Sequence, residues 1–389
     1  MKSKKILENL IYLTVFFIPL YLAKIKIGFF STNVLEIIIS ATFLVWFFSD
    51  KGKINFQDFF QRYKKYIIAG GLMLIGIFLS TFFNGNHLES WGIIKGWFLF
   101  PLIFLFLVGI IIPKEKIDHI FWAYFFSGAT VALISMGYLI LGHLTYDGRL
   151  IGFFNSPNYL AMYLAPAIII SLFQIQNRNL KLKNLLIFLS IIILIAFYFT
   201  YSYGAWIAVL GALLIIALIK KSISLKNIII AILIIIVLFF SQINNKKLTD
   251  LLTANPRSSL SSRIMIWKAS GKMIENNFWI GIGPGNFQNT YLKYQKFYPP
   301  YLEWAVPHPN NLYLTFWLYS GISGLIGFLV LTFFWFKKIF EKIKTEPSEI
   351  LFMALGIMLV ILIHGIFDTT YFKNDLAIVF WLNFLALKK

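Results

Sequence analysis

Arg149, Arg257 and Arg263 are the residues of this sequence whose chemistry best suits a phosphorylated ligand. The chain has only five arginines, and these three lie in segments between long apolar runs. A guanidinium group presents a planar fork of N–H donors and stays charged, so it matches the oxygen atoms of phosphate and pyrophosphate. We therefore expect the three to bind a lipid-linked pyrophosphate. The alternative is that they are ordinary surface residues of exposed loops.

Arg149 is followed by a helix start that favours the same ligand. Ser156 and Pro157 have the residue types of an N-cap and a first helical residue, which places Asn158 in the first turn of the helix expected at 157–175. Unpaired N–H groups at a helix N-terminus attract anions. Arg149 and Asn158 are thus candidate substrate contacts, although a capped helix beside a loop arginine would give the same pattern.

Arg263 falls in a second predicted helix, 260–276, with Ser258 or Ser259 as its cap. The spacing places Leu260, Ile264, Trp267, Gly271 and Ile274 on one face. This pattern predicts an amphipathic helix lying on the membrane surface. Trp267 is four residues after Arg263, so its ring is placed to support the guanidinium. A basic helix that only rests on lipid headgroups is the alternative.

Two histidines are candidates for the proton chemistry. His308 lies between Pro307 and Pro309, which fix the backbone around it, and Asn310 and Asn311 follow. We interpret it as a base, a donor or a phosphate contact. His364 and Asp368 are four residues apart near the end of an apolar run. They form either a polar pair beneath the ligand or a helix–helix hydrogen bond.

Other reactive groups are scarce. The chain has no cysteine, which excludes thiol catalysis and disulfides. Its acidic residues show no metal-ligand spacing, so we expect no metal and no cofactor. The glycine-rich stretch 281–286 offers backbone N–H groups for a phosphate, but a plain tight turn is the better interpretation. Glu303 is a further possible base, or an exposed loop glutamate.

These residues must be positioned by membrane helices. Hydrophobic residues make up 59% of the chain and charged residues 13%, against about 25% charged in ordinary soluble domains. The sequence predicts an all-α integral membrane protein with transmembrane helices 1–9 in 1–242, an extracytoplasmic catalytic loop at 243–309 and helices 10–12 in 310–389. The twelve spans are expected near 10–23, 33–48, 66–83, 91–112, 119–142, 157–175, 184–201, 203–219, 227–242, 311–336, 349–367 and 375–387.

The net charge of +19 reflects topology rather than nucleic-acid binding. If the N-terminus is inside, the inside segments hold 22 of the 35 basic residues, as the positive-inside rule requires. This places both termini in the cytoplasm and Arg149, Arg257 and Arg263 outside, against the rule. We expect no cleavable signal peptide, because the first apolar run lacks a small-residue cleavage site.

Several pieces occur in a fixed order and resemble a known family. They are Gly152–Asn158, Thr200–Trp206, Ser262–Trp267, Gly281–Phe287 and His308–Asn311 with Gly321 and Gly324. Together they are similar to the bacterial O-antigen ligase and O-antigen polymerase superfamily. The resemblance implies a GT-C-like enzyme of the bacterial cytoplasmic membrane. It would transfer a glycan from undecaprenyl pyrophosphate to an acceptor hydroxyl on the outer face, without nucleotide sugar or metal.

The family pattern is matched only in part. Arg263 matches the family's loop arginine, and Asn311, Gly321 and Gly324 match its Asn-x9-Gly-x-x-Gly pattern. The family commonly has Ser-Arg-Gly where this chain has Ser202-Tyr203-Gly204, and His-x-His-Asn where it has His308-Pro309-Asn310-Asn311. Either His308 takes the histidine's role, the transfer needs no histidine base, or the activity has diverged.

We therefore predict a membrane glycan transferase with Arg263, His308 and Arg149 as catalytic residues. The predicted substrate-binding residues are Arg257, Asn158, Trp267, Asn310, Asn311, His364 and Asp368. The expected partners are a lipid-pyrophosphate glycan, an acceptor glycan, glycolipid or protein, and the bilayer, with no nucleic acid. The rival functions are a polyprenyl-linked glycan flippase or transporter and a protein O-oligosaccharyltransferase. A transporter would need ionisable residues through the bundle, which the deep spans largely lack.

Overall fold

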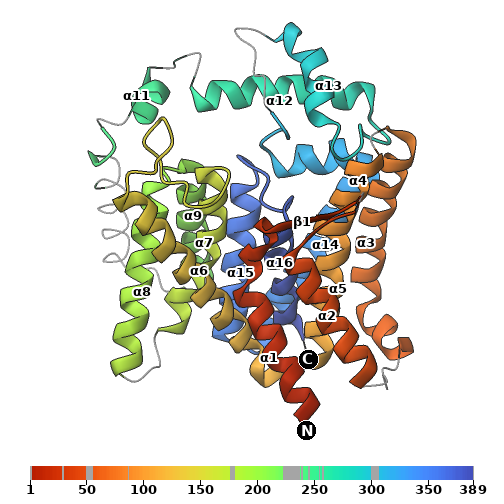
Figure 1. Ribbon diagram of the computed structural model, residues 1–389, viewed down its shortest axis with the longest axis vertical. Coiled ribbons are helices and arrows are strands. Elements are labelled where there is room, and N and C mark those ends of the chain that lie inside the picture. Colours follow the sequence, from red (N-terminus) through yellow and green to blue (C-terminus); the bar gives the residue numbers. More distant parts are fainter. Residues whose placement is uncertain are drawn as a thin grey trace.

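The protein folds into a bundle of helices capped at one end by a layer of short helices (Figure 1). The computed structural model describes residues 2–28, 30–49, 56–85, 87–175, 180–221, 237, 240–243, 246–253, 255, 258–298 and 306–388. Within these described residues, five helical segments are long and apolar enough to cross a membrane: Tyr63–Phe83, His87–Ile111, Lys114–Ile140, Leu180–Phe199 and Leu312–Thr345. Shorter apolar helices cover Val34–Ser49, Tyr203–Ile219, Glu349–His364 and Asn374–Leu387. The predicted helical membrane architecture is thereby confirmed.

Most helix boundaries lie within a few residues of the predicted apolar runs, but the helices starting at Lys2 and Phe56 begin eight and ten residues earlier and the helix ending at Thr345 ends nine residues later than predicted. The first half contains α1 (Lys2–Phe16), η1 (Ile18–Leu22), α2 (Val34–Ser49), α3 (Phe56–Phe83), α4 (His87–Ile94), α5 (Phe100–Ile111), η3 (Lys114–Lys116) and α6 (Ile117–Ile140). The second half contains α7 (Pro157–Gln174), α8 (Leu180–Phe199), α9 (Tyr203–Ile219), α14 (Leu312–Thr345), α15 (Glu349–His364), α16 (Asn374–Leu382) and η5 (Asn383–Leu387). Most of the expected span 227–242 lies outside the described residues. The count of twelve spans stays a prediction.

A short hairpin connects the first two predicted spans. Strands β1 (Lys24–Ile27) and β2 (Phe30–Asn33) pair in antiparallel register. The alternation Lys-Ile-Lys-Ile has the period of a strand. Gly28 takes a positive φ of 58° at the turn, which glycine adopts without strain.

The fourth predicted span is one helical segment with a local change of winding. Between α4 and α5, residues Lys95–Leu99 form a π-helical turn, labelled η2. The Lys95 amine lies 2.9 Å from a carboxylate oxygen of Glu36 and donates to the Ser31 carbonyl. Asn374, at the start of α16, donates to the other Glu36 oxygen at 3.2 Å. The turn therefore connects α2, the fourth span and α16.

Small residues allow α3 and α14 to pack closely. A Cβ on Gly76 of α3 would lie 2.6 Å from the Gly324 nitrogen, and a Cβ on Gly327 would lie 2.5 Å from the Met73 nitrogen. Glycine at a helix interface lets the two backbones approach. Gly324, one of the residues of the family pattern, therefore serves helix packing in this structure.

Helix α14 is broken at Gly321, whose φ of 66° and ψ of −173° are not helical. The glycine-rich turn at 281–286 docks against this break, and the Ile282 N–H donates to the Leu318 carbonyl at 2.7 Å. Gly281, Gly283 and Gly285 all have positive φ values. The interpretation of this stretch as a structural turn fits these contacts better than a phosphate nest does.

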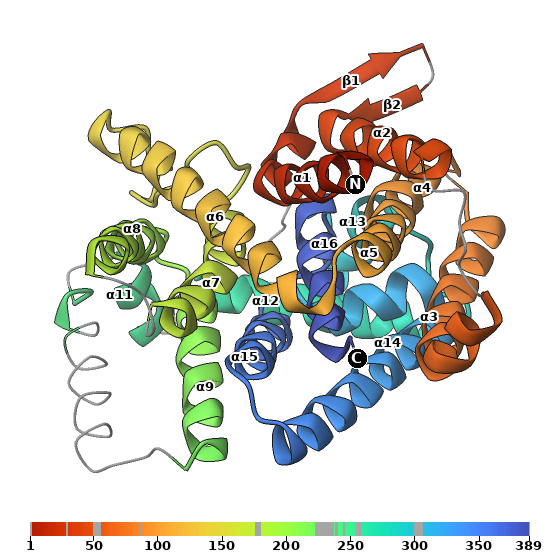
Figure 2. The ribbon, with the colours of Figure 1, turned by 90° about the horizontal axis from the view of Figure 1, so that it is seen from below.

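The long polar segment lies across one end of the bundle, which we call the loop face (Figure 1). It contains α11 (Lys246–Leu252), α12 (Ser259–Asn276), α13 (Phe287–Tyr294) and η4 (Gln295–Phe297). Both chain termini lie toward the opposite end. Seen from that end, α15 and α16 are near the middle, with α7 and α9 on one side and α5 on the other (Figure 2). Helix α15 packs against both α7 and α9.

Candidate functional site

A cavity of about 200 Å³ lies at the loop face where several helices meet. The first turns of α7, α9 and α12 contribute Asn158, Ser202 to Gly204 and Ser258 to Leu260. The end of α15 contributes His364, and the turn after it Phe367. Lys247 and Arg263 bring two cationic side chains to the lining. Helix N-termini and cations at one cavity make an environment for an anion.

Helix α12 carries Arg263 to this cavity. Its N-cap is Ser258, whose side chain accepts from the Ser261 N–H, as one of the two predicted caps requires. The predicted apolar face matches the buried side of the helix only in part: Ile274 is buried, together with Met265, Ile266, Ala269, Ser270 and Met273, whereas Leu260 and Ile264 are exposed. Contacts with α13 and α14 decide which side is covered. Leu260 instead lines the cavity.

The Arg263 guanidinium is held by three different groups. Its Nε donates to the Phe367 carbonyl at 2.9 Å and its Nη1 to the Ser259 hydroxyl at 2.7 Å. Its Nη2 lies 3.8 Å from an Asp368 carboxylate oxygen. These contacts fix the plane of the guanidinium, while its place in the lining leaves the group accessible to a ligand.

Trp267 does not stack on Arg263, contrary to our expectation. Its indole N–H donates to the Pro309 carbonyl at 3.0 Å, and the described residues show no cation–π contact between Trp267 and Arg263. The hydrogen bond joins α12 to the segment that carries His308. Trp267 thus positions two parts of the site relative to each other.

Arg149 and Asp368 are connected through Asn158. The Arg149 Nη2 donates to the Asn158 side-chain oxygen at 2.6 Å, and the Asn158 side-chain nitrogen donates to Asp368 at 2.8 Å. The Arg149 Nε also donates to the Thr200 carbonyl at 2.8 Å. Burial lowers the pKa of Arg149, and the charge of Arg263 lowers this pKa further. Asp147 and Asp368 act in the opposite direction and raise it.

Asp368 is the buried negative charge of the site. It is 3% exposed, so its charge must be compensated by neighbours. Burial acts to raise the pKa of Asp368. Arg263, His308, His364 and the donating Thr369 N–H act in the opposite direction and outweigh burial, so the pKa lies below its ordinary value. The carboxylate therefore stays ionised and balances part of the cationic cluster.

Lys247 belongs to the same cluster and was missed by sequence reasoning. Its amine lies 4.7 Å from the centre of the Tyr203 ring and donates to the Tyr201 carbonyl. Burial lowers its pKa well below the ordinary value, and Arg149 and Arg263 lower it further. Nothing in the local sequence distinguishes it from the neighbouring Lys246, because only the tertiary fold brings α11 against the start of α9.

His308 lies on the other side of Asp368, outside the cavity lining. Its Nε2 is 2.7 Å from the Tyr159 hydroxyl, and the Thr369 hydroxyl lies 3.3 Å from the same nitrogen. Burial lowers the pKa of His308, with Asp368 acting in the opposite direction. The ring is therefore neutral at ordinary pH and is able to accept a proton. The Lys373 amine lies 3.1 Å from the centre of the Tyr159 ring, so a cation also borders this region.

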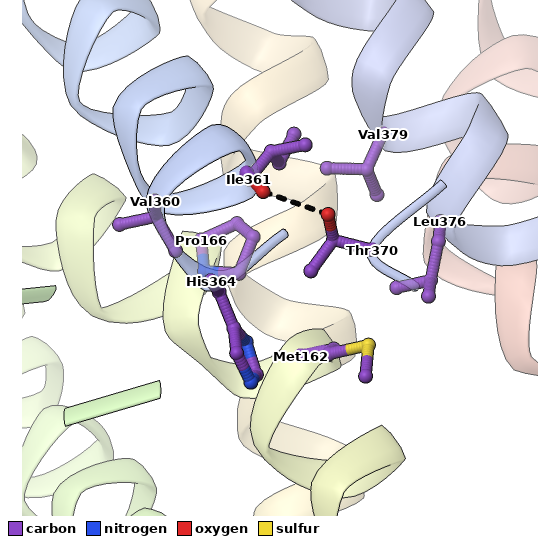
Figure 3. Close-up of a pocket in the computed structure, with 8 residues that line it drawn as sticks. All are labelled: Met162, Pro166, Val360, Ile361, His364, Thr370, Leu376 and Val379. Carbon is purple, nitrogen blue, oxygen red and sulfur yellow. Dashed lines mark hydrogen bonds between the residues drawn. The ribbon is translucent and has the colours of Figure 1, made fainter. Parts of the chain in front are cut away.

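His364 forms part of the floor of the cavity and is 1% exposed. Its Nδ1 has no hydrogen-bond partner among the residues that the structure describes. Figure 3 shows the ring beside Met162 of α7, next to a void of about 10 Å³ that is too small for anything but one water. In the same view Thr370 donates to the Ile361 carbonyl at 2.7 Å, which ties the turn after α15 back onto the helix.

The remaining predicted residues have different positions. Asn311 is the N-cap of α14: its side chain accepts from the Tyr313 and Leu314 N–H groups and donates to the Ile366 carbonyl. These bonds occupy its amide in a structural role. Asn310 has a left-handed φ of 49° and directly precedes this cap. Arg257 and Glu303 lie outside the described residues.

The site has the chemistry of anion binding and proton transfer. Among the described residues, no group of three or more histidine, cysteine, aspartate or glutamate side chains is arranged to hold a metal ion. The cationic cluster of Arg149, Lys247 and Arg263 is partly balanced by Asp368, and Asp147 lies 3.9 Å from Arg149. A neutral histidine is close by.

Comparison with known proteins identifies a family for part of the chain. Residues 188–329 match the family model described as O-antigen ligase. The matched segment begins within α8 and ends within α14, so it contains α9, α12 and Arg263. No curated protein matches the chain.

Proposed function

We propose that this chain, a member of the O-antigen ligase superfamily, is a multi-pass membrane enzyme that moves a glycan from undecaprenyl pyrophosphate to an acceptor hydroxyl. The observation that carries this proposal is the cavity in which Arg263 and Lys247 meet the first turns of α7, α9 and α12. A pyrophosphate placed there meets both cations. The loop face is proposed to be extracytoplasmic, with both termini in the cytoplasm and twelve spans in all.

The proposed reaction is a substitution at the anomeric carbon of the donor sugar. The acceptor oxygen forms a bond to this carbon while the bond from the carbon to the pyrophosphate oxygen breaks. The bonding electron pair leaves with undecaprenyl pyrophosphate. The acceptor proton passes to a base, for which neutral His308 is the candidate, or to the departing phosphate.

The arginines supply most of the rate in this proposal. Negative charge grows on the pyrophosphate as the bond breaks, so fixed N–H donors bind it more tightly in the transition state than in the ground state. Arg263 is oriented by Phe367 and Ser259, and Arg149 by Thr200 and Asn158. Such preorganisation avoids a reorganisation cost during the reaction. In this scheme neither metal nor nucleotide is needed.

The test is transfer by the purified full-length protein in liposomes. Undecaprenyl-pyrophosphate glycan is supplied together with a glycolipid, a free glycan or a protein acceptor, and products are resolved by mass. The proposal expects a new glycosidic bond with release of undecaprenyl pyrophosphate, in the presence of chelator and without nucleotide. Movement of intact donor between leaflets without bond change would favour a flippase. Transfer only to protein would favour an O-oligosaccharyltransferase, and a strict need for a divalent cation would contradict the arginine scheme.

A further inference from the structure

The turn between α8 and α9 directs two neighbouring carbonyls toward two different cations. The Thr200 carbonyl accepts from Arg149 and the Tyr201 carbonyl accepts from Lys247. Tyr201 has a φ of 45°, a left-handed conformation that is unfavourable for a residue with a side chain. The turn directly precedes Ser202 to Gly204, which line the cavity.

Lys247 has the geometry of a ligand contact rather than of a solvated surface lysine. Its side chain is partly buried and lies over the Tyr203 ring, and it lines the same cavity as Arg263. A lysine ammonium over an aromatic ring is stabilised by the ring quadrupole. Ring and carbonyl therefore hold this amine at the lining, in reach of the cavity contents.

Among the residues that the structure describes, the charges around the cavity are not balanced. Besides burial, Arg263 lowers the pKa of Arg149, both arginines lower the pKa of Lys247, and Asp147 and Asp368 act on Lys247 in the opposite direction. Asp147 is exposed, whereas Asp368 is buried. Three cations against two carboxylates leave an excess positive charge at a partly desolvated site. A bound anion would relieve this repulsion.

We propose that Lys247 is a second phosphate-binding residue of the cavity lining and that it shares a lipid-linked pyrophosphate with Arg263. The inference rests on the proposed function. The arginine offers its flat fork to one set of oxygens, while the ammonium acts as a point charge that can follow the second phosphate. Binding at Lys247 is coupled to a proton.

The direction of this coupling follows from the charges. In the empty cavity burial and the two arginines favour the neutral amine, whereas a phosphate favours the ammonium. Binding therefore takes up a proton at pH values between the pKa of the unliganded site and the raised pKa of the bound state. Affinity should fall as pH rises through the pKa of the unliganded site, and it should level off above the raised pKa of the bound state.

The experiment measures the binding of polyprenyl pyrophosphate to the full-length protein in nanodiscs, with the corresponding polyprenyl alcohol as a control for tail binding. Lys247→Gln should weaken pyrophosphate binding by about 10–100-fold without affecting the alcohol, since a lost charge-assisted contact has that effect. Lys247→Arg should retain binding but lose most of its dependence on pH below the ordinary lysine pKa of about 10.4, because arginine does not titrate there. Lys268→Gln, on the exposed side of α12, is the matched control and should bind as the wild type does.

The outcomes separate the two proposals. Weak binding in Arg263→Ala but wild-type binding in Lys247→Gln overturns the role of Lys247 and leaves the proposed function intact. Pyrophosphate binding no stronger than alcohol binding in the wild type overturns both. If Lys247→Gln melts at a lower temperature than Lys268→Gln, the Lys247→Arg variant provides the test instead. If pyrophosphate binding by Lys247→Arg depends on pH as the wild type does, the proposed role of Lys247 is overturned.

Discussion

The side-chain nitrogen of Asn158 donates to the Asp368 carboxylate at 2.8 Å, and this one bond ties the start of α7 to the turn after α15. The same amide accepts from Arg149 at 2.6 Å through its oxygen. A side chain that donates at one end and accepts at the other is required here, because it faces a carboxylate on one side and a guanidinium on the other.

Replacing Asn158 with aspartate should therefore disable the site although the size hardly changes. The new carboxylate cannot donate to Asp368 and would repel it, so donor binding and transfer should fall by about tenfold or more. Asn155→Asp introduces the same charge at an exposed position of the same loop and is the control. Equal activity of the two variants in the liposome assay would contradict the bridging role.

Arg263→Ala should lower the rate of transfer by about 10²–10³-fold, the usual effect of removing one transition-state donor. Arg263→Lys should recover only part of the rate, because one ammonium cannot make the separate contacts to Phe367 and Ser259 while also binding phosphate. Protein level and insertion should barely change. Near wild-type transfer by a normally expressed Arg263→Ala protein would remove the central residue of the mechanism.

The pH dependence of transfer should report on His308. Burial lowers the pKa of His308 below the ordinary histidine value of about 6.5, so the ring is still neutral at that pH. Activity should fall only when the pH drops through the lowered pKa of His308. His308→Gln should reduce kcat about 10²-fold and remove this acid limb. Tyr159→Phe, which removes the hydroxyl 2.7 Å from Nε2, should have a smaller effect. An unchanged rate and pH profile in His308→Gln would assign the acceptor proton to the departing phosphate.

Gly321→Ala should destabilise the protein by disrupting the contact between α14 and the turn that leads to 281–286. The added Cβ would lie 2.1 Å from the Trp279 carbonyl oxygen, and φ is 66°. We expect a loss of roughly 1–3 kcal/mol, seen as a lower melting temperature in detergent. Gly271→Ala in α12 meets no atom within 4 Å and should be neutral or stabilising by up to about 1 kcal/mol. Equal melting temperatures of the two variants would argue that this contact does not stabilise the protein.

The sidedness of the loop face is tested with single cysteines, since the chain has none. Lys268→Cys in α12 and Lys344→Cys near the end of α14 are both exposed and belong to different ends of the bundle. A membrane-impermeant thiol reagent added to intact cells should label the first and spare the second. The reverse pattern would invert the predicted orientation.

The sequence predicted those features that depend only on residues close together along the chain. The caps at Ser156 and Ser258 and the start of α7 at Pro157 follow from residue type and spacing, and the structure confirms them. The apolar runs likewise predicted the helices of the bundle.

Features that depend on distant partners were not predictable from the sequence. The buried side of α12 is decided by α13 and α14, so its apolar periodicity was partly misleading. Lys247 looked like any other lysine until α11 was placed beside Tyr203. Asn311 was expected to bind substrate, but its amide is used by the backbone of α14 and by Ile366.

The π-helical turn at Lys95–Leu99 has a consequence for how this protein can change over evolution. A π turn holds one residue more than the α-helical turn it replaces, and each residue of an α-helix rotates the chain by about 100°. Deleting one residue from this turn would leave a continuous, well-bonded helix. It would also turn Lys95 away from the Glu36 carboxylate, which lies 2.9 Å from its amine. The number of residues in this helix, as well as the identity of Lys95, therefore determines whether α2 remains joined to it.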